Sequence, residues 1–225
     1  MAFGHLFKGI WPVILAASSL AACQGHAWNQ KITVTVDTPD GPKSAFSVIN
    51  ITLENHDAWY ETPESRGVFT SMRGEAVVLE VAPKKYLFAL LKGMPGADQL
   101  CFPRQAPIEV APRLTSNLSP IVLTTEQYPL LVTFGDIADP ASVKRVDPAS
   151  FEANFGSGYA LQSITIAVTD EVVTEGKVEG VLGWLKENGR ARSTLIPSPP
   201  RLQKDARDPD LQYLSVDAFS TELYK

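Results

Sequence analysis

The chain has 225 residues, 44% of them hydrophobic and 20% charged, a composition that supports one sizeable core or two small ones and excludes a disordered tail, a coiled coil and a multi-span membrane protein. Twenty lysines and arginines against 25 aspartates and glutamates give a formal net charge of -5. Because the sequence contains no basic run, it lacks the electrostatic footprint of a nucleic-acid-binding protein.

The N-terminal 22 residues are organised like an export signal. Lys8 precedes an apolar stretch over residues 9–15, and small residues follow over 16–22. A helix that spans a bilayer needs roughly 20 apolar residues, whereas this run is shorter and is interrupted by Pro12. We therefore expect residues 1–22 to be a signal peptide that is removed.

The signal ends in Leu20-Ala21-Ala22-Cys23, which resembles the lipobox of bacterial lipoproteins. The resemblance implies cleavage after Ala22 and attachment of a diacylglycerol to the Cys23 thiol, with a third acyl chain on its amine, so that acyl chains such as palmitate hold the protein in a membrane. Two alternatives remain open. One is an ordinary signal peptide cut after Ala27, and the other is a cytoplasmic protein that merely begins with an apolar segment.

The residues around the two cysteines bear on location and redox state. Gln24 stands where lipoproteins retained in the inner membrane of enteric bacteria often carry aspartate, so the resemblance favours the outer membrane, facing the periplasm, over the inner membrane. A soluble periplasmic protein is the alternative location. Cys101 is the only other cysteine, and acylation of Cys23 would leave it without a partner. Its apolar neighbours indicate a buried thiol, with a disulfide-linked dimer or a reactive thiol as alternatives.

The chain after the signal is expected to have three parts. Residues 23–30 are mostly polar and predict a short tether between the membrane and the folded protein. Residues 31–192 predict a single β-rich domain. Residues 193–225 start with a stretch rich in proline and charge, which predicts an extended segment, and residues 213–219 predict a final strand.

The first half of the domain is expected to contain two strand pairs. Alternating apolar residues and turn-forming residues predict strands over residues 32–37, 45–53, 77–81 and 86–91. A change of parity in the second strand predicts a bulge near Val48 if only one face of that strand is buried, and the continuous apolar character of the fourth predicts a central strand. Recurrent prolines over residues 93–129 allow only short edge strands and loops, of which 121–123 is the best strand.

The second half is expected to contain strands over residues 130–134 and 161–168 and short helices. The tetrad Asp-Pro-Ala-Ser occurs twice and predicts helical turns capped by Asp139 and Asp147. The second turn should stop at Gly156, and an amphipathic helix is predicted over 176–188. The sequence thus predicts a β-rich α+β fold, a sandwich-like antiparallel sheet with short helices in its C-terminal half.

Several stretches of the chain are similar to uncharacterised proteins of alphaproteobacteria. They are residues 28–41 (WNQKITVTVDTPDG), 128–140 (YPLLVTFGDIADP), 143–148 (VKRVDP), 155–158 (FGSG) and 164–170 (ITIAVTD). The resemblance implies an envelope protein with a continuous domain. It carries no activity that could be transferred to this chain.

Carboxylates are the strongest candidates for chemistry. Asp136, Asp139 and Asp147 lie in one loop-rich segment after a buried strand, close enough in sequence to converge on a hard cation such as calcium. The structural alternative is that two of them cap helical turns and that Asp136 lies in a turn. Asp170 and Glu171 are adjacent, so on a strand they would point to opposite faces and form a poor acid-base pair.

Other catalytic signals are weak. The sequence lacks the G-x-S-x-G, H-E-x-x-H, paired C-x-x-C, Walker and G-x-G-x-x-G patterns. After the signal peptide the only histidines are His26 and His56, and the pair His56-Asp57 suits a solvated turn better than a general base with its orienting carboxylate. Residues 155–159 could bring bare backbone close to a ligand, although a helix stop followed by a turn also explains them.

These observations predict a lipid-anchored cell-envelope protein with a non-catalytic binding or structural role, no cofactor, and another envelope protein or a polymer as partner. The alternative is a periplasmic carboxylate- or metal-dependent hydrolase that uses residues 136–147. Catalysis would require at least two of the aspartates at 136, 139, 147 and 170 to face one pocket. Binding would require an exposed apolar patch larger than monomers usually carry.

Overall fold

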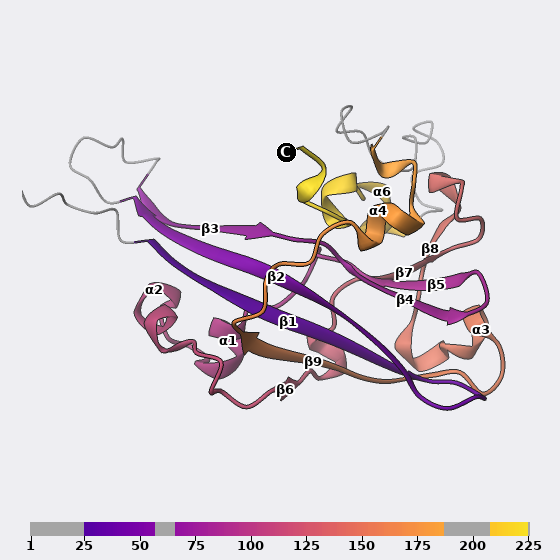
Figure 1. Cartoon of the computed structure of the whole chain (residues 1–225), viewed down its shortest axis with the longest axis horizontal. Coiled ribbons are helices and arrows are strands. Elements are labelled where there is room, and N and C mark those ends of the chain that lie inside the picture. Colours follow the sequence, from indigo (N-terminus) through magenta and orange to yellow (C-terminus); the bar gives the residue numbers. More distant parts are fainter. Residues whose placement is uncertain (1–24, 57–65, 187–207, 225) are drawn as a thin grey trace, which may run out of the picture.

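A computed structural model describes residues 25–56, 66–186 and 208–224, which form two antiparallel sheets surrounded by short helices (Figure 1). The strands are β1 (Gly25–Asp37), β2 (Lys43–His56), β3 (Gly67–Arg73), β4 (Val77–Ala82), β5 (Lys85–Ala89), β6 (Ile121–Val122), β7 (Leu131–Phe134), β8 (Val143–Arg145) and β9 (Ala160–Thr169). The helices and 3-10 turns are α1 (Ala97–Cys101), α2 (Pro107–Val110), η2 (Ala111–Arg113), η3 (Thr125–Gln127), η4 (Pro140–Ser142), η5 (Pro148–Ser150), α3 (Glu152–Phe155), α4 (Lys177–Val181), α6 (Pro209–Gln212), η7 (Val216–Ala218) and η8 (Glu222–Tyr224). None of the helices in the described ranges is long and apolar enough to cross a membrane.

The two sheets pack face to face and confirm the predicted β-rich α+β class. The first has the strand order β3-β2-β1-β9-β6 and the second β4-β5-β7-β8. Alternate residues of β1, namely Ile32, Val34 and Val36, are almost fully buried between the sheets. This is the period that one buried face of a strand requires. The second sheet covers them with Val77, Leu79, Val81, Leu87, Ala89 and Leu131.

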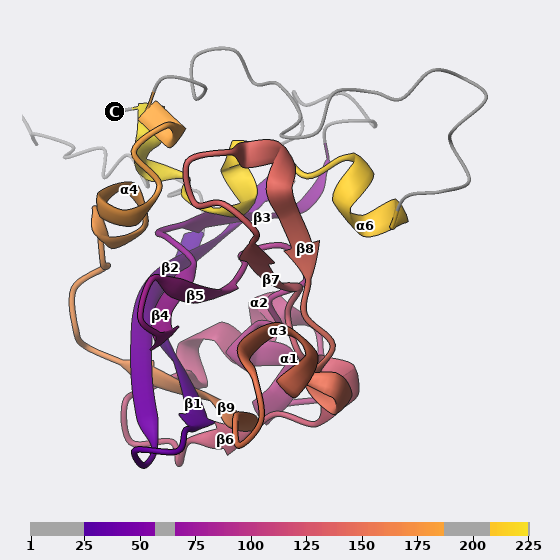
Figure 2. The ribbon, with the colours of Figure 1, turned by 90° about the vertical axis from the view of Figure 1, so that its right-hand side faces the viewer.

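A second core lies on the other face of the four-stranded sheet. β5 lies between β4 and β7, and residues 87–90, of which Leu90 follows the strand, alternate between the two cores, with Leu87 and Ala89 in the first and Phe88 and Leu90 in the second. The prediction of a central strand covered on both faces is confirmed. The second core is closed by residues of the α4 region and of the C-terminal helices, which Figure 2 shows on one side of the sheets.

The predicted tether is wrong for residues 25–30, because β1 already begins at Gly25. Trp28 and Gln30 are only 5% and 0% exposed. The Gln30 side chain accepts a hydrogen bond from the Ala97 backbone N–H (2.8 Å) and donates one to the Pro95 carbonyl (3.0 Å). A polar residue is thus buried by partners 65 or more positions away, which composition cannot indicate.

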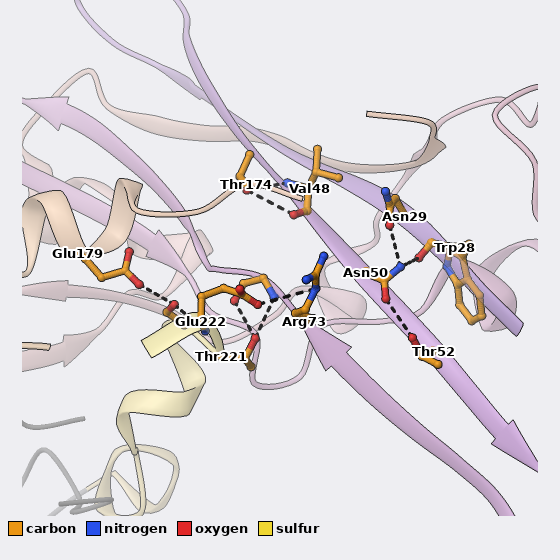
Figure 3. Close-up of polar contacts among 12 residues, drawn as sticks. Trp28, Asn29, Val48, Asn50, Thr52, Arg73, Thr174, Glu179, Thr221 and Glu222 are labelled. Atoms are coloured by element: carbon orange, nitrogen blue, oxygen red, sulfur yellow. Dashed lines mark hydrogen bonds and ion pairs between the residues drawn. The ribbon is translucent and has the colours of Figure 1, made fainter. Parts of the chain in front are cut away.

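The bulge predicted near Val48 is also wrong. The β1–β2 register runs without a shift from the pair Gly25–Glu54 to Val36–Lys43. Val48 and Ile49, which point to opposite faces of β2, are both fully buried. Beside them Thr174 lies along the edge of β2: the Val48 N–H donates to Thr174 Oγ1 and the Val48 carbonyl accepts from the Thr174 N–H, both at 3.0 Å (Figure 3). Both faces of β2 are covered here, so the change of parity needs no bulge.

The C-terminal segment differs most from expectation. Residues 213–219 form no strand: α6 precedes them and η7 lies within them. An isolated β-bridge joins Ser220, the next residue, to Glu75. Leu214 and Phe219 are fully buried, so these residues belong to the second core rather than to an extended tail. Residues 193–207 of the predicted extended segment lie outside the described residues.

Two helix predictions need correction. The sequence predicts a helix over residues 176–188, but α4 covers only Lys177–Val181. Leu182 has left the helical conformation, and Gly180 and Gly183 each weaken a helix by about 1 kcal/mol relative to alanine. The end of the predicted helix lies outside the described residues. Short helices also occur in the first half, in the proline-rich stretch that contains α1 and α2.

Candidate functional site

The residues of the lipobox-like sequence, including Ala22 and Cys23, lie outside the described residues. The described chain begins two residues after Cys23, at Gly25, which is paired with Glu54 of β2. Any group attached to Cys23 is therefore joined to the first strand by a very short stretch of chain.

The candidate carboxylates are held in local structure. Asp139 Oδ1 accepts a hydrogen bond from the Ala141 N–H and Asp147 Oδ1 from the Ala149 N–H, each at 2.9 Å. Both predicted N-caps are confirmed, each beside a proline at the first helical position. Asp136 Oδ1 likewise accepts from the backbone two residues on, at 3.0 Å.

The structure does not bring these carboxylates together. Asp136, Asp147 and Asp170 line three different depressions. Asp170 accepts a hydrogen bond from Ser116 Oγ (2.6 Å), whereas Glu171 forms an ion pair with Lys31 (2.7 Å). In the described part of the chain, no three histidine, cysteine or acidic side chains are grouped as a metal site would require.

His56 lies at the end of β2, whereas its sequence context predicts a solvated turn. Its ring packs edge-on against Phe69 at 4.9 Å between centroids, and its Nε2 lies 3.3 Å from Glu54 Oε2. Asp57, its expected partner, lies outside the described residues.

The helix stop predicted at Gly156 is confirmed. Phe151 and Phe155 stack with 4.6 Å between ring centroids, and Gly156, with φ of 109°, ends α3.

Cys101 is a free, half-buried thiol at the end of α1, packed against the core. Burial, with a smaller contribution from the Asp98 carboxylate, raises the pKa of the Cys101 thiol. A raised pKa keeps the group protonated and unreactive at neutral pH. The side chain acts here as a small hydrophobic group.

Buried carboxylates hold the C-terminal residues against the sheet (Figure 3). Glu75, 1% exposed, accepts a hydrogen bond from the Val178 N–H at 3.0 Å, and Glu179 accepts one from Ser220 Oγ at 2.7 Å. Burial raises the pKa of Glu75 against the opposing effect of the Val178 hydrogen bond, and the nearby Glu179 carboxylate raises it further. This set of contacts joins α4 and the C-terminal segment to the residues just before β4.

A depression lined with lysines was missed by sequence reasoning. It has a volume of about 570 Å³, and Lys84, Lys85 and Lys144 line it together with Asp136 and Asn154. Within the described ranges, none of the three ammonium groups forms a hydrogen bond or an ion pair. Such a surface attracts anionic groups. No local signal could have found it, because the lysines come from the β4–β5 turn and from β8.

The lysine-lined depression lies at the end of the molecule away from Gly25. Lys43, at the far end of the β1–β2 hairpin, donates a hydrogen bond to the Val81 carbonyl next to the β4–β5 turn (3.1 Å). Figure 1 shows this turn and α3 at one end, and the starts of β1 and β3 at the other. The turn is shaped locally, because Lys84 has a positive φ of 60° and its N–H donates to Glu80 Oε1 (2.9 Å).

Exposed large apolar residues are few and mostly scattered. Val122, Val172 and Tyr213 lie apart in the sequence, in β6, in the stretch after β9 and after α6. Val68 and Phe69 are adjacent on the edge strand β3, 43% and 48% exposed. The start of β3 therefore exposes one apolar side chain on each face of the sheet.

Comparison of the chain with models of known protein families, with curated proteins and with solved structures finds no match. The arguments for function therefore come from the residues and their geometry.

Proposed function

We propose that this protein is a lipoprotein of a bacterial envelope, anchored through acyl chains on Cys23 and facing the periplasm, with the outer membrane as its favoured location, and that its β-sandwich has a non-catalytic binding or structural role. The observation that carries the proposal is the sequence Leu20-Ala21-Ala22-Cys23 at the end of an apolar segment, two residues before the first strand. Acyl chains that insert together give stable membrane attachment.

The arrangement of polar groups supports a binding role over the hydrolase alternative. Asp136, Asp147 and Asp170 line separate depressions, and the aspartates at 136, 139, 147 and 170 accept backbone or hydroxyl hydrogen bonds. A catalytic pair would have to face one pocket. The depression lined by Lys84, Lys85 and Lys144, at the end of the molecule away from Cys23, suits an anionic group on another envelope protein or polymer.

Metabolic labelling with a clickable fatty acid tests the anchor. Wild-type protein should be labelled, Cys23→Ser should lose the label, and the matched variant Cys101→Ser should keep it. Mass spectrometry of native protein that finds an unmodified peptide running uncut through residue 23 would overturn the proposal.

Crosslinking in intact envelopes tests the binding role. The double variant Lys84→Glu/Lys144→Glu replaces two of the lysines that line the depression and should weaken capture of an acidic partner. The control Lys186→Glu changes the charge elsewhere on the surface and should leave capture unchanged. Equal capture by all three proteins would contradict a role for the depression.

A further inference from the structure

We propose that the end of the five-stranded sheet nearest Cys23 rests on the lipid surface and inserts Val68 and Phe69 into the interfacial region of the bilayer. This basal end consists of Gly25, Glu54, Val68 and Phe69. The inference rests on the proposed lipidation of Cys23 and adds a second, non-covalent contact between the protein and its membrane.

Strand register places the exposed apolar pair beside the start of β1. Gly25 is paired with Glu54 of β2, and Glu54 is paired with Phe69 of β3, so the three residues form one row across the sheet. Neighbouring strands lie about 4.8 Å apart, which puts Phe69 about 10 Å from Gly25. Val68, paired with Asn55, lies one residue nearer the start of β3.

Covalent geometry limits how far this row can stand from the membrane. Only Gln24 separates Cys23 from Gly25, and a chain segment of two residues spans at most about 7 Å. Acyl chains on Cys23 are buried in the bilayer, so Gly25 would lie within that distance of the lipid attachment point. With a tether over residues 23–30 the domain could stand away from the surface, but β1 uses residues 25–30.

The side chains at the basal end suit a lipid interface. Val68 and Phe69 are 43% and 48% exposed and, as consecutive residues of a strand, point to opposite faces of the sheet end. Phe69 packs edge-on against His56. Apolar side chains of this kind enter the boundary between headgroups and acyl chains to a depth of about 5–10 Å when an interfacial segment binds. The row contains one carboxylate, Glu54, and it lies 3.3 Å from His56 Nε2.

The same sheet offers an internal control at Val122. This residue is 63% exposed, but it is paired with Thr165, which is paired with Thr33 of β1. The row of Thr33 is eight residues along β1 from Gly25, or about 26 Å at 3.3 Å per residue. A probe at Val122 should therefore remain in water while one at the basal end contacts lipid.

Fluorescence quenching tests the contact in the complete, lipidated protein. Thr70→Cys, next to the apolar pair, and Val122→Cys would each carry an environment-sensitive fluorophore in a Cys101→Ser background, since the Cys23 thiol is acylated. The proteins are reconstituted in vesicles of phosphatidylethanolamine and phosphatidylglycerol that contain a lipid with a shallow nitroxide. Quenching should be at least about threefold stronger at 70 than at 122, and adding Val68→Ser/Phe69→Ser should remove most of the difference.

The outcomes separate this inference from the anchor. Equal quenching at the two positions in protein that is acylated and bound to vesicles would overturn the lipid contact and leave the proposed function intact. Protection of position 70 from aqueous iodide without nitroxide quenching would also overturn it, because a second copy or another protein would then cover β3. Absence of acyl mass on Cys23 would refute the proposed function and, with it, this inference.

Discussion

Phe219 offers the sharpest test of how the C-terminal segment contributes to the fold. Its side chain is fully buried, with ring centroids 5.9 Å from those of Phe88 and Phe134 and 6.4 Å from that of Trp184. Replacing a buried phenylalanine by alanine costs about 3–5 kcal/mol in free energy of unfolding, including the cavity that remains. In a protein of this size each kcal/mol lowers Tm by about 2–4 °C, so Phe219→Ala should lower Tm by about 6–20 °C.

Calorimetry and urea denaturation measure this change, and Tyr213→Ala is the matched control. Tyr213 lies in the same segment but is 68% exposed, so its replacement should change the free energy of unfolding by no more than about 0.5 kcal/mol. If Phe219→Ala costs less than about 1 kcal/mol, residues 208–224 do not form part of the second core in solution and the layered arrangement is refuted.

Substitutions at four further positions test local features. Burial raises the pKa of Glu75 above its ordinary 4.5, so the stability contributed by the protonated carboxyl is present below pH 4.5 and is lost as pH rises through the raised pKa. Urea midpoints should show wild type losing stability relative to Glu75→Gln over that range. Parallel plots of urea midpoint against pH for the two proteins would contradict this. Asp147→Ala removes an N-cap and should cost about 1 kcal/mol in chemical denaturation, while Asp147→Asn should cost much less. Gly180→Ala, with open space around it, should raise the unfolding free energy by about 0.5–1 kcal/mol. Gly74→Ala should lower it, because φ is 139° and the added Cβ would lie 2.9 Å from Ile49; a gain in Tm would count against that strain.

Features with a short-range cause were predictable from sequence. The β1–β2 hairpin, the β4–β5 pair and β7 follow from alternation or apolar runs bounded by turn residues. The caps at Asp139 and Asp147 were predictable because donor and acceptor lie two residues apart. These are the carboxylates that also resemble a candidate metal site, and their local bonds explain why they do not converge on one pocket.

Features that depend on distant partners were not predictable. Gln30 is polar yet buried, because its side-chain amide forms hydrogen bonds with the backbone of Pro95 and Ala97. Val48 lies where Thr174, from a distant part of the chain, pairs with the edge of β2. Phe219 ends the stretch over residues 213–219 whose pattern predicts a strand, yet it packs in the second core directly after a 3-10 turn. In each case the free energy of a long-range contact outweighs local preference, which differs between conformations by only fractions of a kcal/mol per residue.

The same distinction applies to the surface. Composition and the order of residues near the N-terminus are enough to predict export and lipid attachment, because peptidases and acyl transferases act on an extended sequence. The lysine-lined depression and the row that joins Gly25 to Phe69 exist only after strands from separate parts of the chain have paired. Hydrogen bonding between strands sets which side chains become neighbours, and a linear pattern does not contain that register.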